Sequence, residues 1–100
     1  MIVKEHRHPD GKIVLAVCDS DLVGKKFEEG DKQLNLASSF YKGSEQEDLT
    51  VGDMMRNSDS VSIVGPKAIQ LGLNEGIIEQ ESILTIAGIP YATTPLEKDI

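Results

Sequence analysis

Short stretches in which apolar residues alternate or run together predict β-strands near the N-terminus. Two such stretches cover residues 2–8 and 12–19. The second is apolar on both faces, which is typical of a central strand covered on both sides. Pro9, Asp10 and Gly11 lie between them, and these residue types favour a tight turn. We therefore expect the chain to begin with a β-hairpin.

The next part of the chain is mostly polar. Residues 19–31 are interrupted by two glycines before position 31, which predicts an irregular connection. Within residues 33–41, Leu34 and Leu36 alternate with polar residues, and this pattern indicates a further strand.

Two segments carry the signals of helices. The first is expected to begin at Thr50, a residue type that caps helices, or alternatively at Ser44, and to end near Asn57. A strand is predicted over residues 60–64. The second helix follows it over residues 66–74, where a proline occupies its favourable first position.

A last strand is expected over residues 82–87, after which residues 88–91 turn the chain away. The elements add up to about four or five strands and two helices in an α+β (mixed α/β) fold. We expect a single compact α/β domain over residues 1–92 and a loosely ordered C-terminal tail over residues 93–100.

Composition narrows the classes of function. The 100 residues are 39% hydrophobic and 27% charged, which is ordinary for one soluble domain, and the net charge is −7. This charge disfavours free nucleic acid as the sole ligand and anionic membranes as a partner. The first charged side chain is already Lys4, and the longest apolar run covers only residues 13–18. A signal peptide or membrane span is therefore not expected, and we predict a cytoplasmic protein.

No arrangement of residues points clearly to a catalytic group, a metal or a cofactor, and we assign none. In the predicted hairpin, His6 and His8 lie about 13 Å from Cys18, because a strand rises ~3.3 Å per residue, and this distance forbids direct proton transfer. Cys18 is expected to be a small buried hydrophobe. His6 and His8 have a spacing that can hold a divalent metal, but the sequence shows no third ligand.

The acidic residues that follow the second strand support an enzymatic alternative. They are Asp19, Asp21, Glu28, Glu29 and Asp31. Carboxylates at the end of a strand can bind magnesium or act as general acids and bases, although this spacing does not fit an EF-hand.

Gly65 and Lys67 form a candidate anion-binding site. They open the second predicted helix directly after a strand, where a helix N-terminus attracts anions. Pro66 lacks one of the amides that would bind the anion, so a purely structural turn is the competing interpretation.

Basic residues concentrate in the first quarter of this acidic chain. The candidate partner-binding residues are Lys4, Arg7, Lys12, Lys25 and Lys26. They can contact phosphates locally despite the net charge. Glu5 and Asp10 lie among them, so a solvated surface of mixed charge is the alternative.

Two signatures resemble an archaeal family, domain-of-unknown-function family 424. The run CDSDLVGKKFEEG at residues 18–30 resembles the early signature of that family. Residues 64–65, the helix that ends at residues 75–76, and IAGIPYA at residues 86–92 are similar to its closing signature. A His often stands in relatives where Tyr91 stands here. The resemblance implies a compact cytoplasmic α/β protein and brings no established activity, cofactor or catalytic residue.

Two functions of different classes follow from these observations, and the sequence leaves the partner and the oligomeric state open. The first is a small non-enzymatic cytoplasmic binding module for a protein or ribonucleoprotein partner, linked to translation or RNA handling. The second is a small enzyme that uses the acidic loop over residues 19–31 with a divalent metal. Because no clear catalytic constellation is present, we favour the binding module.

Overall fold

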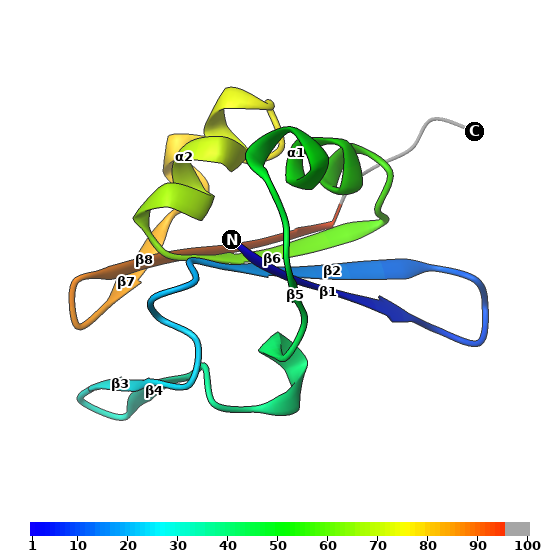
Figure 1. The fold of residues 1–100 in the computed structure, drawn as a ribbon. Helices are drawn as coiled ribbons and strands as arrows, with labels where there is room; N and C mark the ends of the chain where they lie inside the picture. Colours follow the sequence, from blue (N-terminus) through cyan, green and yellow to red (C-terminus); the bar gives the residue numbers. More distant parts are fainter. Residues whose placement is uncertain (96–100) are drawn as a thin grey trace.

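The computed structural model describes residues 1–95, and a six-stranded sheet forms its centre (Figure 1). In chain order its strands are β1 (Ile2–Arg7), β2 (Ile13–Cys18), β5 (Ser44–Glu45), β6 (Ser60–Val64), β7 (Leu84–Ile86) and β8 (Ile89–Pro95). They lie side by side in the order β5-β1-β2-β6-β8-β7. Neighbours β2 and β6 run parallel, and the other pairs are antiparallel.

Two helices cover one face of this sheet, as Figure 1 shows. They are α1 (Asp48–Arg56) and α2 (Pro66–Asn74). The main core lies between them and the sheet, and its buried members include Leu15, Val17, Val51, Met55, Ile63 and Ile69. None of the helices within residues 1–95 is long and apolar enough to span a bilayer.

A small second sheet lies against the opposite face. It consists of β3 (Lys26–Glu29) and β4 (Lys32–Asn35), and a single 3-10 turn, η1 (Ser39–Tyr41), follows it. Cys18, Leu34 and Leu36 are buried there in a separate apolar cluster. The end of β2 near Cys18 is therefore covered on both faces, as its apolar pattern predicted.

The parallel pair positions the candidate site. After β2 the chain passes through β3, β4, β5 and α1 before it enters β6, so the C-terminal ends of β2 and β6 meet at one end of the sheet. The backbone N–H of Asp19 donates a hydrogen bond to the carbonyl of Val64 at 3.1 Å. Asp19, which follows β2, and Gly65, which follows β6, therefore both lie at the start of α2.

Several predictions made from the sequence are confirmed. The fold is α+β with an N-terminal hairpin, in which β1 and β2 pair from Ile2 opposite Cys18 to Arg7 opposite Ile13. A strand and a helix occupy residues 60–64 and 66–74 as expected. The strand count of four or five was low, because the two hairpins β3–β4 and β7–β8 and the two-residue strand β5 add strands.

The first of these hairpins corrects the interpretation of residues 19–41. The expected irregular connection contains β3, and the expected strand over residues 33–41 ends at Asn35 and is followed by η1. Gly30, with φ +63°, makes the tight turn between β3 and β4. Only one apolar side chain on each strand, Phe27 and Leu34, contributes to the adjacent core, so the pattern was too sparse to detect.

Helix α1 begins between the two expected starts. It starts at Asp48 rather than at Thr50 or Ser44, because the N–H of Val51 already bonds the carbonyl of Glu47 at 2.9 Å. No side chain caps this end, so the hydroxyl of Thr50 was a misleading signal.

The C-terminal boundary also differs from the expected one. The strand over residues 82–87 is shorter, and the chain returns through Ala87 and Gly88 into β8 rather than turning away. The expected tail began at residue 93, but Thr93 and Thr94 continue β8 opposite Ser62 and Val61. Threonine is β-branched and suits a strand. Residues 96–100 of the expected tail lie outside the described residues.

Candidate functional site

A cleft of about 640 Å³ opens at the end of the sheet where β2 and β6 terminate. Its lining includes Asp19, Ser20 and Asp21 after β2, Asp48 from α1, and Lys67 and Gln70 from α2. In α/β proteins, the crevice outside the carboxyl ends of parallel strands is a common place for ligands. This cleft is therefore the candidate functional site.

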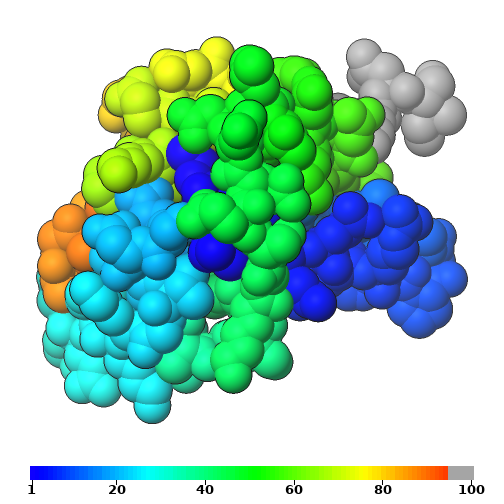
Figure 2. All heavy atoms as spheres, viewed as in Figure 1, coloured from blue at the N-terminus to red at the C-terminus, as the bar shows by residue number. Residues whose placement is uncertain are grey.

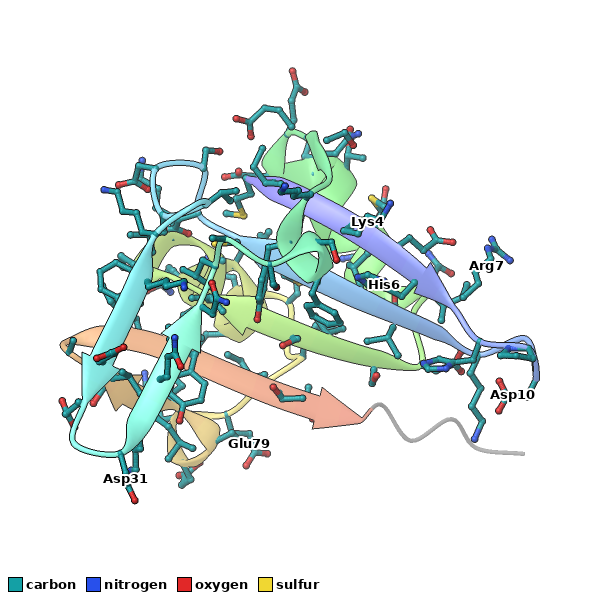
Figure 3. The ribbon with its side chains drawn as sticks, turned by 90° about the horizontal axis from the view of Figure 1, so that it is seen from below. Lys4, His6, Arg7, Asp10, Asp31 and Glu79 are labelled. Atoms are coloured by element: carbon teal, nitrogen blue, oxygen red, sulfur yellow. The ribbon has the colours of Figure 1, made fainter. Side chains whose placement is uncertain are left out.

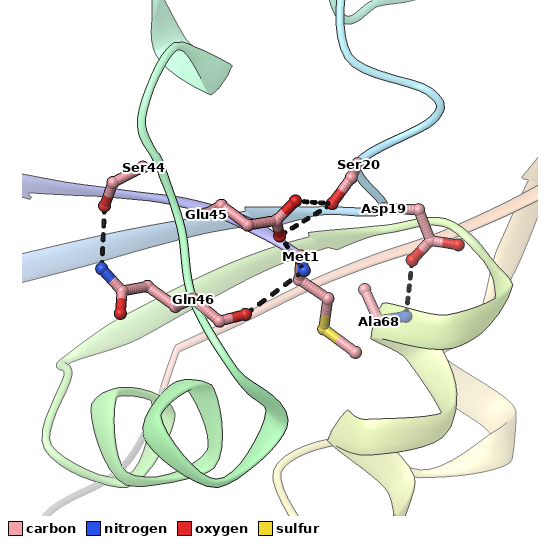
Figure 4. Close-up of polar contacts among 7 residues, drawn as sticks. All are labelled: Met1, Asp19, Ser20, Ser44, Glu45, Gln46 and Ala68. Atoms are coloured by element: carbon pink, nitrogen blue, oxygen red, sulfur yellow. Dashed lines mark hydrogen bonds and ion pairs between the residues drawn. The ribbon is translucent and has the colours of Figure 1, made fainter.

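Asp19 is the buried member of the cleft, with 2% of its surface exposed. Its carboxylate accepts hydrogen bonds from the backbone N–H of Lys67 at 3.0 Å and from that of Ala68 at 2.7 Å. Figure 4 shows the contact with Ala68. Helix α2 has no cap from its own first residues, so Asp19 supplies the negative charge and the acceptors that its N-terminus needs.

Gly65 allows this approach between β2 and α2. Its φ is +106°, and a Cβ at this position would lie 2.4 Å from the Cγ of Asp19. Such a separation is far below van der Waals contact, so a side chain here would push the carboxylate away from the amides. The glycine is thus required by both backbone conformation and space.

The candidate anion site at Gly65 and Lys67 coincides with this arrangement. Pro66 has no N–H, the amides of Lys67 and Ala68 are held by Asp19, and the N–H of Ile69 bonds the carbonyl of Gly65 at 2.9 Å. Anion binding stays a prediction, and an anion would have to displace Asp19 to reach these amides.

A second set of polar contacts closes the cleft on the side of β5. The hydroxyl of Ser20 donates to the Glu45 carboxylate at 2.7 and 2.8 Å, and the amino group of Met1 lies 2.5 Å from Glu45 (Figure 4). Hydrogen bonds from the Met1 amine and from Ser20 lower the pKa of Glu45. Glu45 therefore stays ionised and joins β5 to the loop after β2.

Cys18 lies directly before this site but is completely buried. Burial, followed by the nearby charges of Asp19 and Asp21, raises the pKa of the thiol to about 12. The group is protonated near neutral pH and cannot act as a thiolate nucleophile. The expectation of a small buried hydrophobe at this position is confirmed.

The five acidic residues of the loop do not all converge on one point, and of them only Asp19 and Asp21 line the cleft. Asp19 caps α2, and Glu29 accepts a hydrogen bond from the backbone N–H of Ala87 at 3.0 Å. Asp31 lies at the far tip of the β3–β4 hairpin (Figure 3). Within residues 1–95, no group of three or more His, Cys, Asp or Glu residues is placed to hold a metal ion. The enzymatic alternative stays a hypothesis with its carboxylates dispersed.

The five basic candidates form two separate groups. Lys4, Arg7 and Lys12 belong to β1 and the turn that follows it, whereas Lys25 and Lys26 lie at the start of β3. In Figure 1 the β1–β2 turn lies at the right of the molecule and β3 at the lower left. Arg7 also pairs with Glu5 at 3.0 Å. That a partner contacts all five residues stays a prediction. Such a partner would need a surface long enough to reach both groups.

The two histidines, His6 in β1 and His8 directly after it, have different surroundings. The Nε2 atom of His6 lies 3.0 Å from the carbonyl oxygen of Phe40, and the two rings stack with centroids 4.4 Å apart. His8 is exposed beside the turn. His6 therefore helps to hold η1 against β1.

The sequence contained one usable signal for the role of Asp19. The predicted helix over residues 66–74 has glycine and proline where a capping side chain is usual, so its cap had to come from elsewhere in the chain. Asp48, Gln70 and Asn74 had no such signal. They meet in the cleft only through the packing of α1 beside α2.

Comparisons with known proteins place the chain by family and fold. Residues 6–94 match a family model described as a protein of unknown function (DUF424). The solved crystal structure of an uncharacterized conserved protein from Methanopyrus kandleri is similar, with a TM-score of 0.77 and 21% identity. The match covers 99% of this chain and 96% of the other. No curated protein matches the chain.

Proposed function

For this chain, which belongs to the DUF424 family of proteins of unknown function, we propose a role as a non-enzymatic cytoplasmic binding module. Its cleft at the ends of β2 and β6 receives a basic segment of a protein partner. The partner is of the kind found in ribonucleoproteins, whose proteins carry many Lys and Arg residues, and this would connect the module to translation or RNA handling.

The observation that carries this proposal is the charge of the cleft. Asp19, Asp21 and Asp48 line it, against the side chain of Lys67 and the amino group of Met1, which is already paired with Glu45. Asp21 and Asp48 are exposed to solvent. A cationic group is attracted to such a surface, and the net charge of −7 steers it in the same direction from a distance.

The rest of the lining suits a long basic side chain. Met1 and Leu71 are apolar and partly buried beside the cleft, while Gln70 and Asn74 offer polar groups. Lys and Arg bury their aliphatic stems against apolar surface and keep their charged ends near acceptors. A stem against Leu71 with its charged end near Asp48 would use both parts of this lining.

Binding is favoured over catalysis because the groups best suited to chemistry already have structural roles. Asp19 is committed to the amides of α2, Glu29 to the N–H of Ala87, and Cys18 is buried and protonated. None of these three groups is therefore an activated nucleophile or base. The exposed carboxylates around the cleft are still able to contact a partner.

The test is a titration of the protein with a Lys- and Arg-rich peptide, followed by NMR chemical shifts and calorimetry. We expect shifts to concentrate around Asp21, Asp48 and Gln70, and Asp21→Asn and Asp48→Asn to weaken binding. Asp31→Asn removes the same charge at the distant tip of the β3–β4 hairpin and is the matched control. Equal weakening by Asp31→Asn would show general charge attraction and would contradict a role for the cleft.

A further inference from the structure

The β1 strand leaves part of the sheet edge open. Strand β5 pairs only with Ile2 and Val3, at the beginning of β1. Figure 2 shows the result, because the green chain around β5 covers the start of β1, while the blue hairpin beyond it is uncovered on the viewed face. Gly43 continues past β5 and lies against the backbone of Val3 and Lys4. The segment from Glu5 to Arg7 is therefore the sheet edge that the described residues do not cover with a further strand.

The backbone groups at this edge alternate in a defined way. Met1 pairs with Gln46 towards β5, with N···O distances of 2.9 and 3.3 Å. The N–H of His8 bonds the carbonyl of Lys12 at 2.9 Å, towards β2. Because successive residues of a strand direct their backbone groups to opposite sides, Glu5 and Arg7 direct theirs outwards, away from β2.

We propose that this edge pairs with the same edge of a second copy of the chain. The two β1 strands run antiparallel about a two-fold axis at His6, so Glu5 of each copy lies opposite Arg7 of the other. Both residues have outward backbone groups, so each such pair exchanges two hydrogen bonds. The two sheets then join into one continuous sheet across the dimer.

Side-chain charge selects this register and disfavours its neighbours. Glu5 and Arg7 share a face of β1, where they already form an ion pair at 3.0 Å. A shift in one direction places Glu5 opposite Glu5. A shift in the other places Arg7 opposite Arg7 and brings Pro9, which has no N–H, opposite Glu5. Directly opposed like charges destabilise a strand pair, whereas opposite charges stabilise it.

A hollow beside the edge offers space for the turn of a second copy. This hollow of about 480 Å³ lies at the junction of β1 and β5, and its lining includes Lys4, Lys42 and Gly43. In the proposed register, His8 of the second copy comes opposite Lys4, beside which Gly43 lies, so the residues after His8 must leave the edge and enter this hollow. Asp10 in that turn then brings a negative charge towards two lysines.

Sedimentation equilibrium over a range of concentrations, up to millimolar, tests this proposal. We expect the mass to rise towards twice the 10.9 kDa of the chain. Glu5→Arg and Arg7→Glu should each weaken dimerisation about tenfold or more, because both symmetric pairs become repulsive. An equimolar mixture of the two variants should dimerise again, because every Arg at position 5 or 7 then faces a Glu.

Two controls separate this edge from general charge effects. Glu28→Arg and Lys32→Glu make the same charge changes on the β3–β4 hairpin and should leave dimerisation unchanged. Unfolding of each variant in denaturant verifies that it is folded. A wild-type chain that stays monomeric at millimolar concentration overturns the proposal. So does a dimer that survives Glu5→Arg, or a mixture of variants that does not reassociate.

Discussion

The carboxylate of Asp19 lies 2.7 Å from the backbone nitrogen of Ala68, and these residues are 49 positions apart in the chain. One side chain therefore joins the end of β2 to the first turn of α2. The bond is formed in the interior beside the cleft, where Asp19 is almost completely buried. The wall of the candidate site thus depends on a contact that also stabilises the fold.

Replacement of Asp19 should therefore destabilise the protein. Asp19→Ala leaves the buried N–H of Ala68 and the partly buried N–H of Lys67 without an acceptor and should lower the free energy of unfolding by about 2–3 kcal/mol. Asp19→Asn keeps one acceptor and should cost about 1 kcal/mol. Urea unfolding followed by circular dichroism measures both. Asp21→Asn, at an exposed neighbour, is the control and should change the value by no more than about 0.5 kcal/mol.

Gly65→Ala should be destabilising through the same contact. The new Cβ would lie 2.4 Å from the Cγ of Asp19, and φ at this position is +106°. We expect a loss of about 2–3 kcal/mol in the free energy of unfolding.

A double-mutant cycle separates the two causes of that loss. An Asp19→Ala background removes the contacts with Cγ and Oδ2, and only the contact of 2.8 Å with the Cβ of residue 19 and the backbone strain remain. Gly65→Ala should therefore cost less there than in the wild type. Equal costs in both backgrounds would show that Asp19 does not oppose a side chain at position 65.

These contacts explain which parts of the structure the sequence could predict. The β1–β2 turn at Pro9–Gly11 and the start of α2 at Gly65–Pro66 depend on local residue types, and both were predicted at their observed positions. The β3–β4 hairpin depends on Phe27 and Leu34 packing against residues far along the chain, so its local pattern was weak. The cleft was not predicted as a site, because α1 and α2 bring its residues together only in the folded chain.

The thiol of Cys18 should react very slowly in the folded protein. Its pKa is raised from 9.0 to about 12, mainly by burial, so the thiolate fraction at pH 8 is lower by roughly a thousandfold. Labelling with a chromogenic disulfide, with and without denaturant, measures this difference. Fast labelling of the folded chain, at the rate of the unfolded one, would mean that β2 opens readily.

The same shift predicts how stability depends on pH. The folded pKa of Cys18 lies above the unfolded one, so the protonated thiol contributes fully below pH 9 and its contribution is lost as the pH rises towards 12. The difference in unfolding free energy between wild type and Cys18→Ser should therefore change over this interval. A difference that is constant between pH 8 and 11 would contradict the shift.

Ala87 offers a stabilising substitution outside both proposed interfaces. It has φ +51° in the turn between β7 and β8, next to Gly88 at +79°, and it is the one residue other than glycine with positive φ within residues 1–95. Positive φ at both positions matches the mirror-image turn that hairpins prefer, and an L side chain is strained there.

Ala87→Gly keeps the N–H that bonds Glu29 and should raise the free energy of unfolding by about 0.5–1 kcal/mol. Thermal and urea unfolding measure the change, and Ala92→Gly, in a buried strand position, should have the opposite sign. Destabilisation by Ala87→Gly would mean that the methyl group contributes more through packing than the backbone loses through strain.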